Sequence, residues 1–491
     1  MSPSPSIAAS LPPDFRQKLS IEVLSKSKPV SHLAREHQVS RKFLYQQGNK
    51  AKQALTECFE PSTPDDQVLF HLPITKSWLT QLILGVVLMC HSSYRGVIEL
   101  FRDLFDLPIS IGTIHNRLES AAIRALTINE AQDLSRIRVG LQDEIYQGSQ
   151  PVLTGVDAAS LYCYLLAGVE HRDKETWSWH LLDPMEQGFN PDFTVADGAK
   201  GLRAGQKIVM PETPCHGDIF HIQQECQDLK NSLTRQVKGA LSGILKLEEQ
   251  IAKARLTSQV TRKMTSKLAQ AKRVERTLEP LTKDIKTLLQ WLSHDVLELA
   301  GPPIGIRLEL FDFIVAELQK RECKEHPKIG TLRKSLRNQR DALLAFAGVL
   351  DQKLAEIAVC FKMPLQKVRD VCLLYRKHPT SNAYWERWIQ LHGEISGNFY
   401  RLMEAVGEAL NQTPRASSLV ENLNSRLRNY FFLRKQLAPS YLNLLQFFLN
   451  HRCFMRSEVP EREDKSPTQL MTGQPHSHWL ELLGFKRFKR A

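Results

Sequence analysis

Residues 151–169 of the chain read PVLTGVDAASLYCYLLAGV, the first of several apolar stretches of strand length. Short runs of β-branched and aromatic residues bounded by polar turns predict β-strands. We expect five strands, at 151–157, 160–169, 176–183, 193–197 and in PCHGDIFHI, which begins at Pro214. The polar turn EHRDKE joins the second to the third, and an acid ends the first and the fourth. The sequence therefore predicts a small β-rich core.

Helical patterns surround this core. Upstream, KPVSHLAREHQVS precedes RKFLYQQGNKAKQAL, with Ala34 in the middle of one helix, Val39 in a tight turn and Ser40 at an N-cap. This spacing is typical of a helix-turn-helix. The helix after Ser40 would expose side chains of the types that contact phosphates and base edges, namely Arg41, Lys42, Tyr45, Gln46, Asn49 and Lys50. The alternative is a small three-helix bundle without DNA contact.

A second helical segment, from about Ile74 to Gln147, repeats the same pattern. We expect a helix that ends near Phe105, a turn through DLPIS, and a further helix capped by Ser110. That helix would present His115, Asn116 and Arg117 to DNA. Simple packing is the alternative interpretation.

After Gln223 the pattern is helical for nearly two hundred residues. Apolar residues recur at steps of three and four on both sides of Thr257 and Ser258, which predicts an antiparallel hairpin with basic outer faces. We expect its second helix to end at Pro280. The hairpin would either contact DNA or form a solvated coiled-coil arm.

Composition limits the class of protein. Of the 491 residues, 42% are hydrophobic and 24% charged, which excludes wholesale disorder, and the length predicts about three domains. The 65 Lys and Arg exceed the 53 Asp and Glu, so a net charge of +12 favours a polyanionic partner. Nine irregularly spaced cysteines indicate free thiols in a reducing compartment. No apolar run reaches the ~20 residues of a membrane span, and the N-terminus lacks the pattern of a secretory signal.

Three acids stand out by position. Asp157 ends one predicted strand, Asp197 ends another, and Glu421 opens a helix in SSLVENLNSRLR. Hard carboxylate oxygens of this kind can hold two Mg²⁺ ions about 3.5–4 Å apart for phosphoryl transfer. Each acid alone would pass as a surface residue or a helix cap, and only their ordered combination points to a metal site.

These stretches resemble the DDE transposases of bacterial insertion sequences, whose catalytic domain has the RNase H-like fold. The matching segments are TGVDAAS, TVADGAKGL, CHGDIFHI, VENLNSRLRNYFFLRK and the C-terminal SPTQLMTG. The resemblance implies metal-binding catalytic acids at Asp157, Asp197 and Glu421, with Asn424 and Arg428 on neighbouring turns as DNA contacts. It also implies Mg²⁺ as cofactor, two ions per site, with Mn²⁺ as a substitute.

Two features depart from the family pattern. The family places a full helix between its third and fourth strands, where only PMEQGFNPD is available here, so Asp218 competes with Asp197 as the second acid. About 220 residues also separate Asp197 from Glu421, which requires a helical insertion. Cys215, His216, His221 and Cys226 lack the paired spacing of a zinc site, which is the weaker interpretation of that cluster.

We therefore expect a mostly α, α+β protein: an RNase H-like catalytic core with N-terminal helix-turn-helix domains and a large all-α insertion. The expected divisions are a tail and helix-turn-helix at 1–58, a second helical domain at 67–148, the first part of the core at 151–223, the insertion with its coiled-coil hairpin at 224–410, the core helices with the last acid at 411–457, and a basic tail at 458–491.

The expected function is that of a DNA transposase that binds the ends of its element and cuts and rejoins strands. Its partners would be double-stranded DNA and a second copy of the chain, as a homodimer or larger assembly, with no membrane. The expected location is the bacterial cytoplasm, on the nucleoid. The alternatives are a catalytically inactive, transposase-derived DNA-binding regulator and a coiled-coil interaction protein with a chance pattern of acids.

Overall fold

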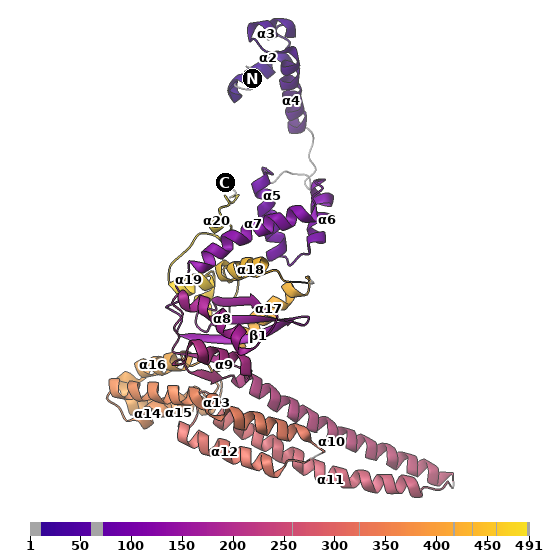
Figure 1. Ribbon diagram of the computed structural model, residues 1–491, viewed down its shortest axis with the longest axis vertical. Helices are drawn as coiled ribbons and strands as arrows, with labels where there is room; N and C mark the ends of the chain where they lie inside the picture. Colours follow the sequence, from indigo (N-terminus) through magenta and orange to yellow (C-terminus); the bar gives the residue numbers. More distant parts are fainter. Residues whose placement is uncertain are drawn as a thin grey trace. The chain divides into compact units, whose positions relative to one another are not determined.

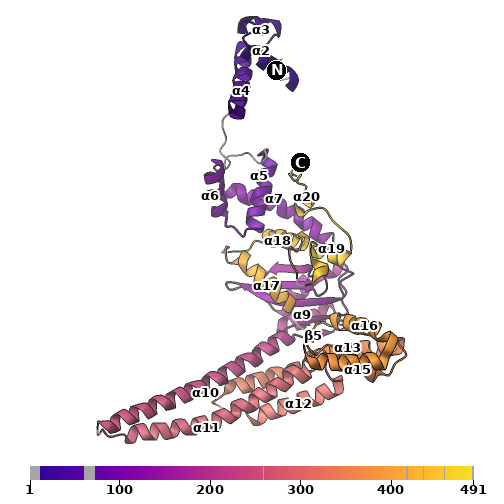
Figure 2. The same cartoon turned by 180° about the vertical axis from the view of Figure 1, so that it is seen from behind.

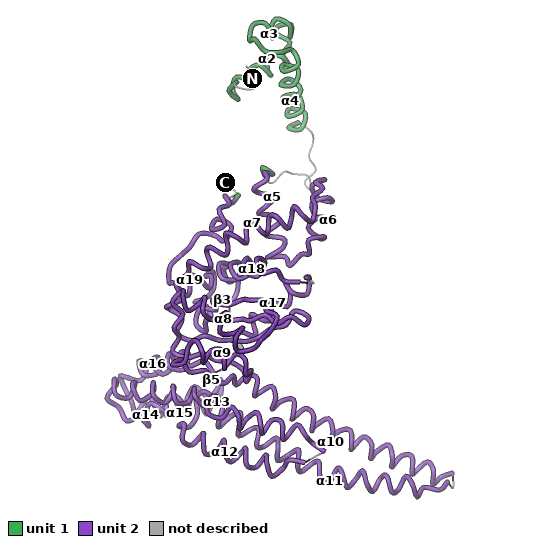
Figure 3. The backbone as a smooth tube through the Cα atoms, viewed as in Figure 1, with its two compact units in different colours: residues 1–74, 488–491 green, residues 75–487 purple. Residues whose placement is uncertain are grey.

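The computed structural model describes residues 11–59, 72–257, 259–323, 325–415, 418–434, 436–457 and 459–488. The fold is mostly helical with one small mixed sheet, in agreement with the α+β prediction (Figure 1). The chain divides into two compact units, residues 1–74 with 488–491 and residues 75–487, and each is described by itself (Figure 3). Within the described ranges, no helix is both long and apolar enough to cross a bilayer.

The first unit contains three helices around a small apolar core. They are α2 (Pro13–Leu24), α3 (Val30–Glu36) and α4 (Arg41–Phe59). Leu19, Leu33 and Leu44 are fully buried between them. Val39 lies in the turn before α4, and the Ser40 hydroxyl accepts a hydrogen bond of 3.1 Å from the Phe43 amide, as an N-cap does. The predicted turn and cap are both present.

The second unit opens with three more helices, α5 (Lys76–Leu88), α6 (Tyr94–Phe105) and α7 (Ile111–Glu130). The predicted helix end at Phe105 and the Ser110 cap are confirmed, because the Ser110 side chain accepts from the Thr113 amide at 3.1 Å. The expectation that helix continues to Gln147 is wrong. Helix α7 ends at Glu130, and a strand begins at Val139.

Five strands form the sheet of this unit: β1 (Val139–Gln147), β2 (Gln150–Asp157), β3 (Cys163–Gly168), β4 (Phe193–Ala196) and β5 (Cys215–Gly217). Their order across the sheet is β3-β2-β1-β4-β5. β2 is antiparallel to both β1 and β3, whereas β4 runs parallel to β1 and β5 parallel to β4. The strand that the sequence reasoning missed, β1, is therefore the central one.

The segment predicted as a strand at 176–183 is instead the helix α8 (Lys174–Glu186). The Asp173 carboxylate caps it by accepting from the Thr176 amide at 2.9 Å. Trp177 and Leu181, four residues apart, are fully buried, whereas Trp179 is 73% exposed. The cap and this helical spacing outweigh the β-propensity of Thr and Trp, which misled the prediction.

Helices cover both faces of the sheet (Figures 1 and 2). Helices α7, α17 (Ser418–Phe431) and α18 (Pro439–His451) share one apolar core with the sheet face that carries Leu141 and Ile145. Helices α8 and α9 (Lys200–Val209) pack in a separate core against the opposite face. Side chains of a strand alternate between the two faces, so residues two apart in a strand pack against the same group of helices.

The long insertion is entirely helical. It consists of α10 (Ile219–Leu256), α11 (Arg262–Trp291), the π-helical η2 (Leu292–Val296), α12 (Ile304–Lys320), α13 (Pro327–Cys360), α14 (Leu365–Leu374), α15 (Asn382–Ile395), the 3₁₀ turn η3 (Ser396–Asn398) and α16 (Phe399–Asn411). The expected hairpin is present as α10 and α11 (Figure 2). Pro280 does not end its second helix, because buried Leu278 and Thr282 hold α11 in its packing on both sides of the proline.

The insertion leaves and rejoins the core at one point. The backbone amide of Ile219, the first residue of α10, donates a hydrogen bond of 3.1 Å to the carbonyl of Arg415. The chain then enters α17, and beyond α18 it forms the 3₁₀ turn η4 (Pro460–Arg462), α19 (Pro467–Thr472) and α20 (Trp479–Leu482). The helical insertion therefore does not separate α17 from the strands.

Candidate metal centre

The candidate site is centred on Asp143, in the middle of β1. Asp143 is 5% exposed and lies on the sheet face shared with Leu141 and Ile145, toward α17. Its carboxylate accepts hydrogen bonds from the side-chain amide of Asn424 at 2.7 Å and from the Glu144 backbone amide at 2.8 Å. A buried carboxylate is thus held in a fixed orientation by a helix and by its own strand.

Two other potential ligands converge on this carboxylate. Ligand atoms of Asp143, His221 and Glu421 all lie within 4.8 Å of one another, and they come from β1, α10 and α17. Glu421 and Asn424 are three residues apart in α17, so both face β1. In the part of the chain that the structure describes, these three residues form the group of His, Cys, Asp or Glu side chains whose ligand atoms lie close enough together to hold a metal ion.

Asp197 lies beside the group. Ala196 of β4 is in register with Gln142 of β1, so the next residues along these parallel strands are Asp197 and Asp143. Neighbouring strands lie about 4.8 Å apart, and residues in register share a face of the sheet. The Asp197 carboxylate accepts a hydrogen bond of 2.8 Å from the Ala199 amide instead of joining the three ligands.

Electrostatics sets the protonation of the group. The pKa of Asp143 is raised to about 7, chiefly by burial and in smaller part by the carboxylates of Glu421 and Asp197, against the hydrogen bond from Glu144 and the charge of His221. The pKa of His221 is raised to about 9, chiefly by its hydrogen bond to Asp218. Without a bound cation, clustered carboxylates repel one another, and a protonated His221 offsets part of that charge.

Asp218, the rival candidate for second acid, has a different position. Its buried side chain accepts a hydrogen bond from the Phe220 amide at 2.9 Å, at the start of α10, and bonds to Nδ1 of His221. It lies behind the histidine and orients the imidazole toward Asp143 and Glu421, in the manner of a second-layer partner of a metal ligand.

Asp157 lies on the other face of the sheet. It is in register with Gly140, three residues from Asp143, so alternation turns its side chain away from α17. Its carboxylate accepts hydrogen bonds from the Ser160 and Ala159 amides at 2.9 and 3.3 Å, which closes the turn after β2. Burial raises the pKa of Asp157, and the Ser160 hydrogen bonds oppose that shift. The structure does not bring Asp157 to Glu421.

The predicted DNA contacts divide into exposed and buried residues. On α4, Arg41, Lys42, Tyr45, Gln46, Asn49 and Lys50 are all exposed, as are His115, Asn116 and Arg117 on α7. Arg428 is also exposed and lies 3.8 Å from the Glu421 carboxylate. Asn424 is 1% exposed and donates a hydrogen bond to Asp143, so its side chain orients the acid and is not presented at the surface.

The sequence did contain a signal for β1. Val139, Leu141 and Ile145 alternate with polar residues, and the two-residue turn Gly148–Ser149 joins β1 to β2. Gly148 has a φ of +63°, a conformation that glycine adopts without strain in a tight hairpin. Asp143 interrupts the apolar face of this strand, which is why the segment passed as helical.

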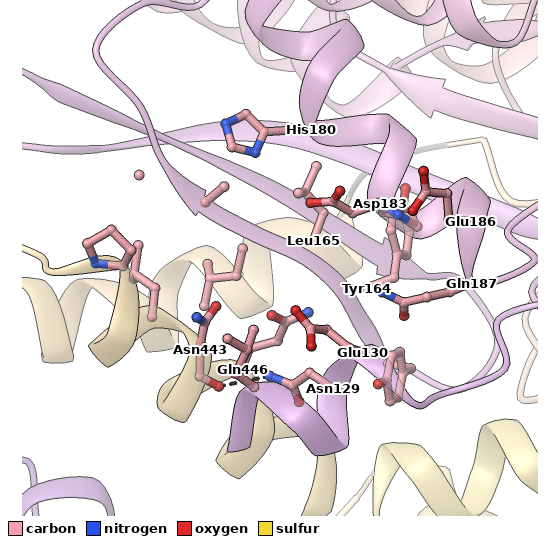
Figure 4. A pocket seen from close by; sticks show the side chains of 18 residues that line it. Asn129, Glu130, Tyr164, Leu165, His180, Asp183, Glu186, Gln187, Asn443 and Gln446 are labelled. Atoms are coloured by element: carbon pink, nitrogen blue, oxygen red, sulfur yellow. Dashed lines mark hydrogen bonds between the residues drawn. The ribbon is translucent and has the colours of Figure 1, made fainter. Parts of the chain in front are cut away.

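The group lies apart from the pocket shown in Figure 4. That pocket, with a volume of about 650 Å³, lies beside the edge strand β3 and is lined by residues of α7, α8 and α18. His180, Asp183 and Glu130 contribute its polar surface. None of the three ligand residues lines it, so we do not connect it with metal chemistry.

Comparisons with known proteins add little. No protein-family model matches the chain, and no curated protein matches it. Among solved structures, the Drosophila P element transposase strand transfer complex aligns over 89% of this chain and 97% of that chain, with 12% sequence identity and a TM-score of 0.23. At that TM-score the alignment does not establish a shared fold. The function must therefore be argued from the geometry of the site.

Proposed function

We propose that the protein is a DDE-type DNA transposase with an RNase H-like core, and that its metal-binding acids are Asp143, Asp197 and Glu421. Asp143 replaces Asp157 in this assignment. The observation that carries the proposal is the convergence of Asp143, His221 and Glu421 within 4.8 Å, from elements far apart in the sequence. Asp197 completes the set from the adjacent parallel strand.

The strand count supports this assignment. Because β1 was missed and α8 was taken for a strand, the expected order was displaced by one. With β1 counted first, the first acid of the family pattern falls on the first strand, as Asp143. Helix α8 then supplies the full helix between the third and fourth strands, and the fourth strand ends in Asp197-Gly198 before α9. The departure at this point of the family pattern disappears, while the helical insertion still accounts for the long separation of Asp197 from Glu421.

The donor set fits Mg²⁺ or Mn²⁺. Carboxylate oxygens are the ligands these ions prefer, and a buried acid with a raised pKa binds a cation by losing its proton. Divalent ions bound here would supply charge stabilisation for an in-line displacement at phosphorus. Asn424 would hold Asp143 in place, and Asp218 would orient His221 toward the same point.

The proposed reaction has two steps. The oxygen of a water forms a bond to phosphorus while the bond to the 3′ oxygen breaks, which leaves a 3′-hydroxyl and a 5′-phosphate. That hydroxyl then attacks a phosphodiester of target DNA and displaces another 3′ oxygen. The exposed residues of α4 and α7 would bind the ends of the element, and joining two ends requires at least two copies of the chain.

The test is a strand-cleavage assay beside a binding assay on the DNA that flanks the gene. Asp143→Asn should reduce Mg²⁺-dependent cleavage by at least about 100-fold, because phosphoryl transfer depends on electrostatic positioning. Asp157→Asn is the matched control, with the same chemical change on the opposite face. Full cleavage by the Asp143 variant, or loss of cleavage only in the Asp157 variant, would contradict the assignment.

A further inference from the structure

A second concave site lies on another face of α17, and four arginines line it. Arg426 comes from α17, Arg452 and Arg456 from the segment after α18, and Arg462 from η4. We call these four residues the arginine pocket. Its volume is about 650 Å³, and Leu161, Leu419 and Phe454 add apolar surface. No acidic residue is among the described residues that line it.

Among the described residues, no ion pair balances the charge of the pocket, although Arg462 interacts electrostatically with the buried carboxylate of Asp157. Within the described part of the chain, none of the four guanidinium groups lies within 4.0 Å of a carboxylate; the ion pair of α17 is Arg428 with Glu421. Arg452 contacts Phe448 and the Met455 sulfur, and Arg462 donates to the Ala159 carbonyl at 3.2 Å. The exposed acids Glu461, Glu463 and Asp464 follow nearby in the sequence without pairing with them.

Neighbouring groups respond to this concentrated charge. The pKa of His91 is lowered by burial first and then by Arg452 and Arg426. The pKa of Arg426 itself is lowered, by burial first and also by Arg452. Like charges brought together in a hollow repel one another, and this cost is recovered when an anion binds between them.

We propose that the arginine pocket binds consecutive phosphates of a DNA strand that leaves the metal centre. This inference rests on the proposed function, because it names how the substrate of that site is held. Asn422 lines the pocket and directly follows Glu421. Arg426 lies about 7.5 Å from Glu421 along the helix axis. A DNA strand carries one negative charge per about 3.4 Å of axis, so a strand held at Glu421 presents about two phosphates over that distance.

The choice of arginine fits this ligand. A guanidinium group presents a planar fork of donors that matches phosphate oxygens, and it is hydrated more weakly than a lysine ammonium. The apolar surface next to the arginines suits the sugar and base edges of a single strand.

The test measures DNA binding in EDTA, with a short duplex and a single strand of arbitrary sequence. The variant is Arg452→Gln with Arg456→Gln, both on a segment outside the cores. The control is Arg401→Gln with Lys377→Gln, which removes the same charge from exposed positions on and beside the helices of the insertion. For two lost phosphate contacts, the slope of log affinity against log salt should fall by about 1.8 for duplex or about 1.4 for single strand. The control should keep the slope of the unchanged protein.

A slope as steep in the pocket variant as in the control overturns the inference. Arg426→Lys keeps the charge but loses the fork, so it should weaken binding while leaving the slope nearly unchanged. ATP is the probe for a free nucleotide: if it stabilises the protein through these arginines while the DNA slope stays the same, the DNA assignment is wrong. Competition by polyglutamate as strong as by the single strand would likewise exclude a phosphate site.

Because the assay contains no divalent metal, its outcome does not depend on cleavage. Loss of cleavage in every form of the protein, with a reduced slope in the pocket variant, would overturn the proposed chemistry and support the pocket. Intact cleavage with an unchanged slope in the pocket variant would support the proposed chemistry and overturn the pocket. A protein that binds no DNA at all would overturn both.

Discussion

At the scale of residues, the buried carboxylate of Asp143 makes metal binding sensitive to pH. Its pKa of about 7 lies far above the usual value of 3.8, so the folded protein holds this proton through the mildly acidic range. A divalent ion needs the ionised carboxylate, so we expect Mn²⁺ affinity to rise as the pH rises through about 7, and to rise further toward about 9 because His221 must lose its proton to act as a ligand. Calorimetric titrations at pH 6 and pH 8, in buffers of different ionisation enthalpy, should show about one more proton released at pH 6 than at pH 8.

The same residue should destabilise the metal-free fold at high pH. Because the folded pKa is raised, unfolding releases the proton, and the free energy of unfolding falls as the pH rises from about 4 to about 7. Asp143→Asn removes this titration, so its stability relative to the unchanged protein should grow between pH 5 and pH 8 in EDTA. Urea unfolding measures this difference. A constant difference across that range would show that Asp143 is not buried as described.

At the scale of elements, the arm formed by α10 and α11 should be separable from the site. Leu233 and Leu278 belong to the core at the base of the arm and Val237 packs against it, whereas the buried residues further along α10, Ile244, Ile251 and Ala254, lie outside that core. Replacing residues 240–273 with a short Gly/Ser loop should therefore leave the Mn²⁺-dependent rise in melting temperature unchanged. Loss of that rise in a variant that still unfolds cooperatively would show that the arm shapes the metal centre.

Sequence patterns predicted most elements but not the one that carries the chemistry. The Ser40 and Ser110 caps, the strands β2 to β5 and the helical hairpin follow from local signals that the structure retains. Two of the errors, the missed strand β1 and the helix α8 taken for a strand, arose where a charged residue interrupts an apolar face and where a helix contains Trp and Thr. Convergence of Asp143 with Glu421 depends on register across β1 and on the packing of α17, and no local pattern encodes either.

At the scale of the whole molecule, the DNA contacts expected on α4 should be separable from the metal chemistry, because the two belong to different compact units. The first has its own core around Leu19, Leu33 and Leu44, while the acids all belong to residues 75–487. A chain that begins at Thr75 should keep its Mn²⁺-dependent stabilisation, worth about 2.7 kcal/mol at a hundred times the dissociation constant. It should lose DNA affinity and about one unit of salt slope for each lost contact of Arg41, Lys42 or Lys50. An unchanged slope would show that α4 does not contact DNA.

The hydrogen bond between Ile219 and Arg415 has a consequence for the order in which the proposed centre is assembled during synthesis. Strands β1 to β5, with Asp143 in β1 and Asp197 directly after β4, leave the ribosome before the insertion, but the nascent chain has no third acid until the insertion has been synthesised and its end returns to Ile219. The proposed centre therefore remains incomplete for most of the synthesis of the chain. Translation that stops anywhere within the insertion would yield a fragment that lacks Glu421 and Asn424.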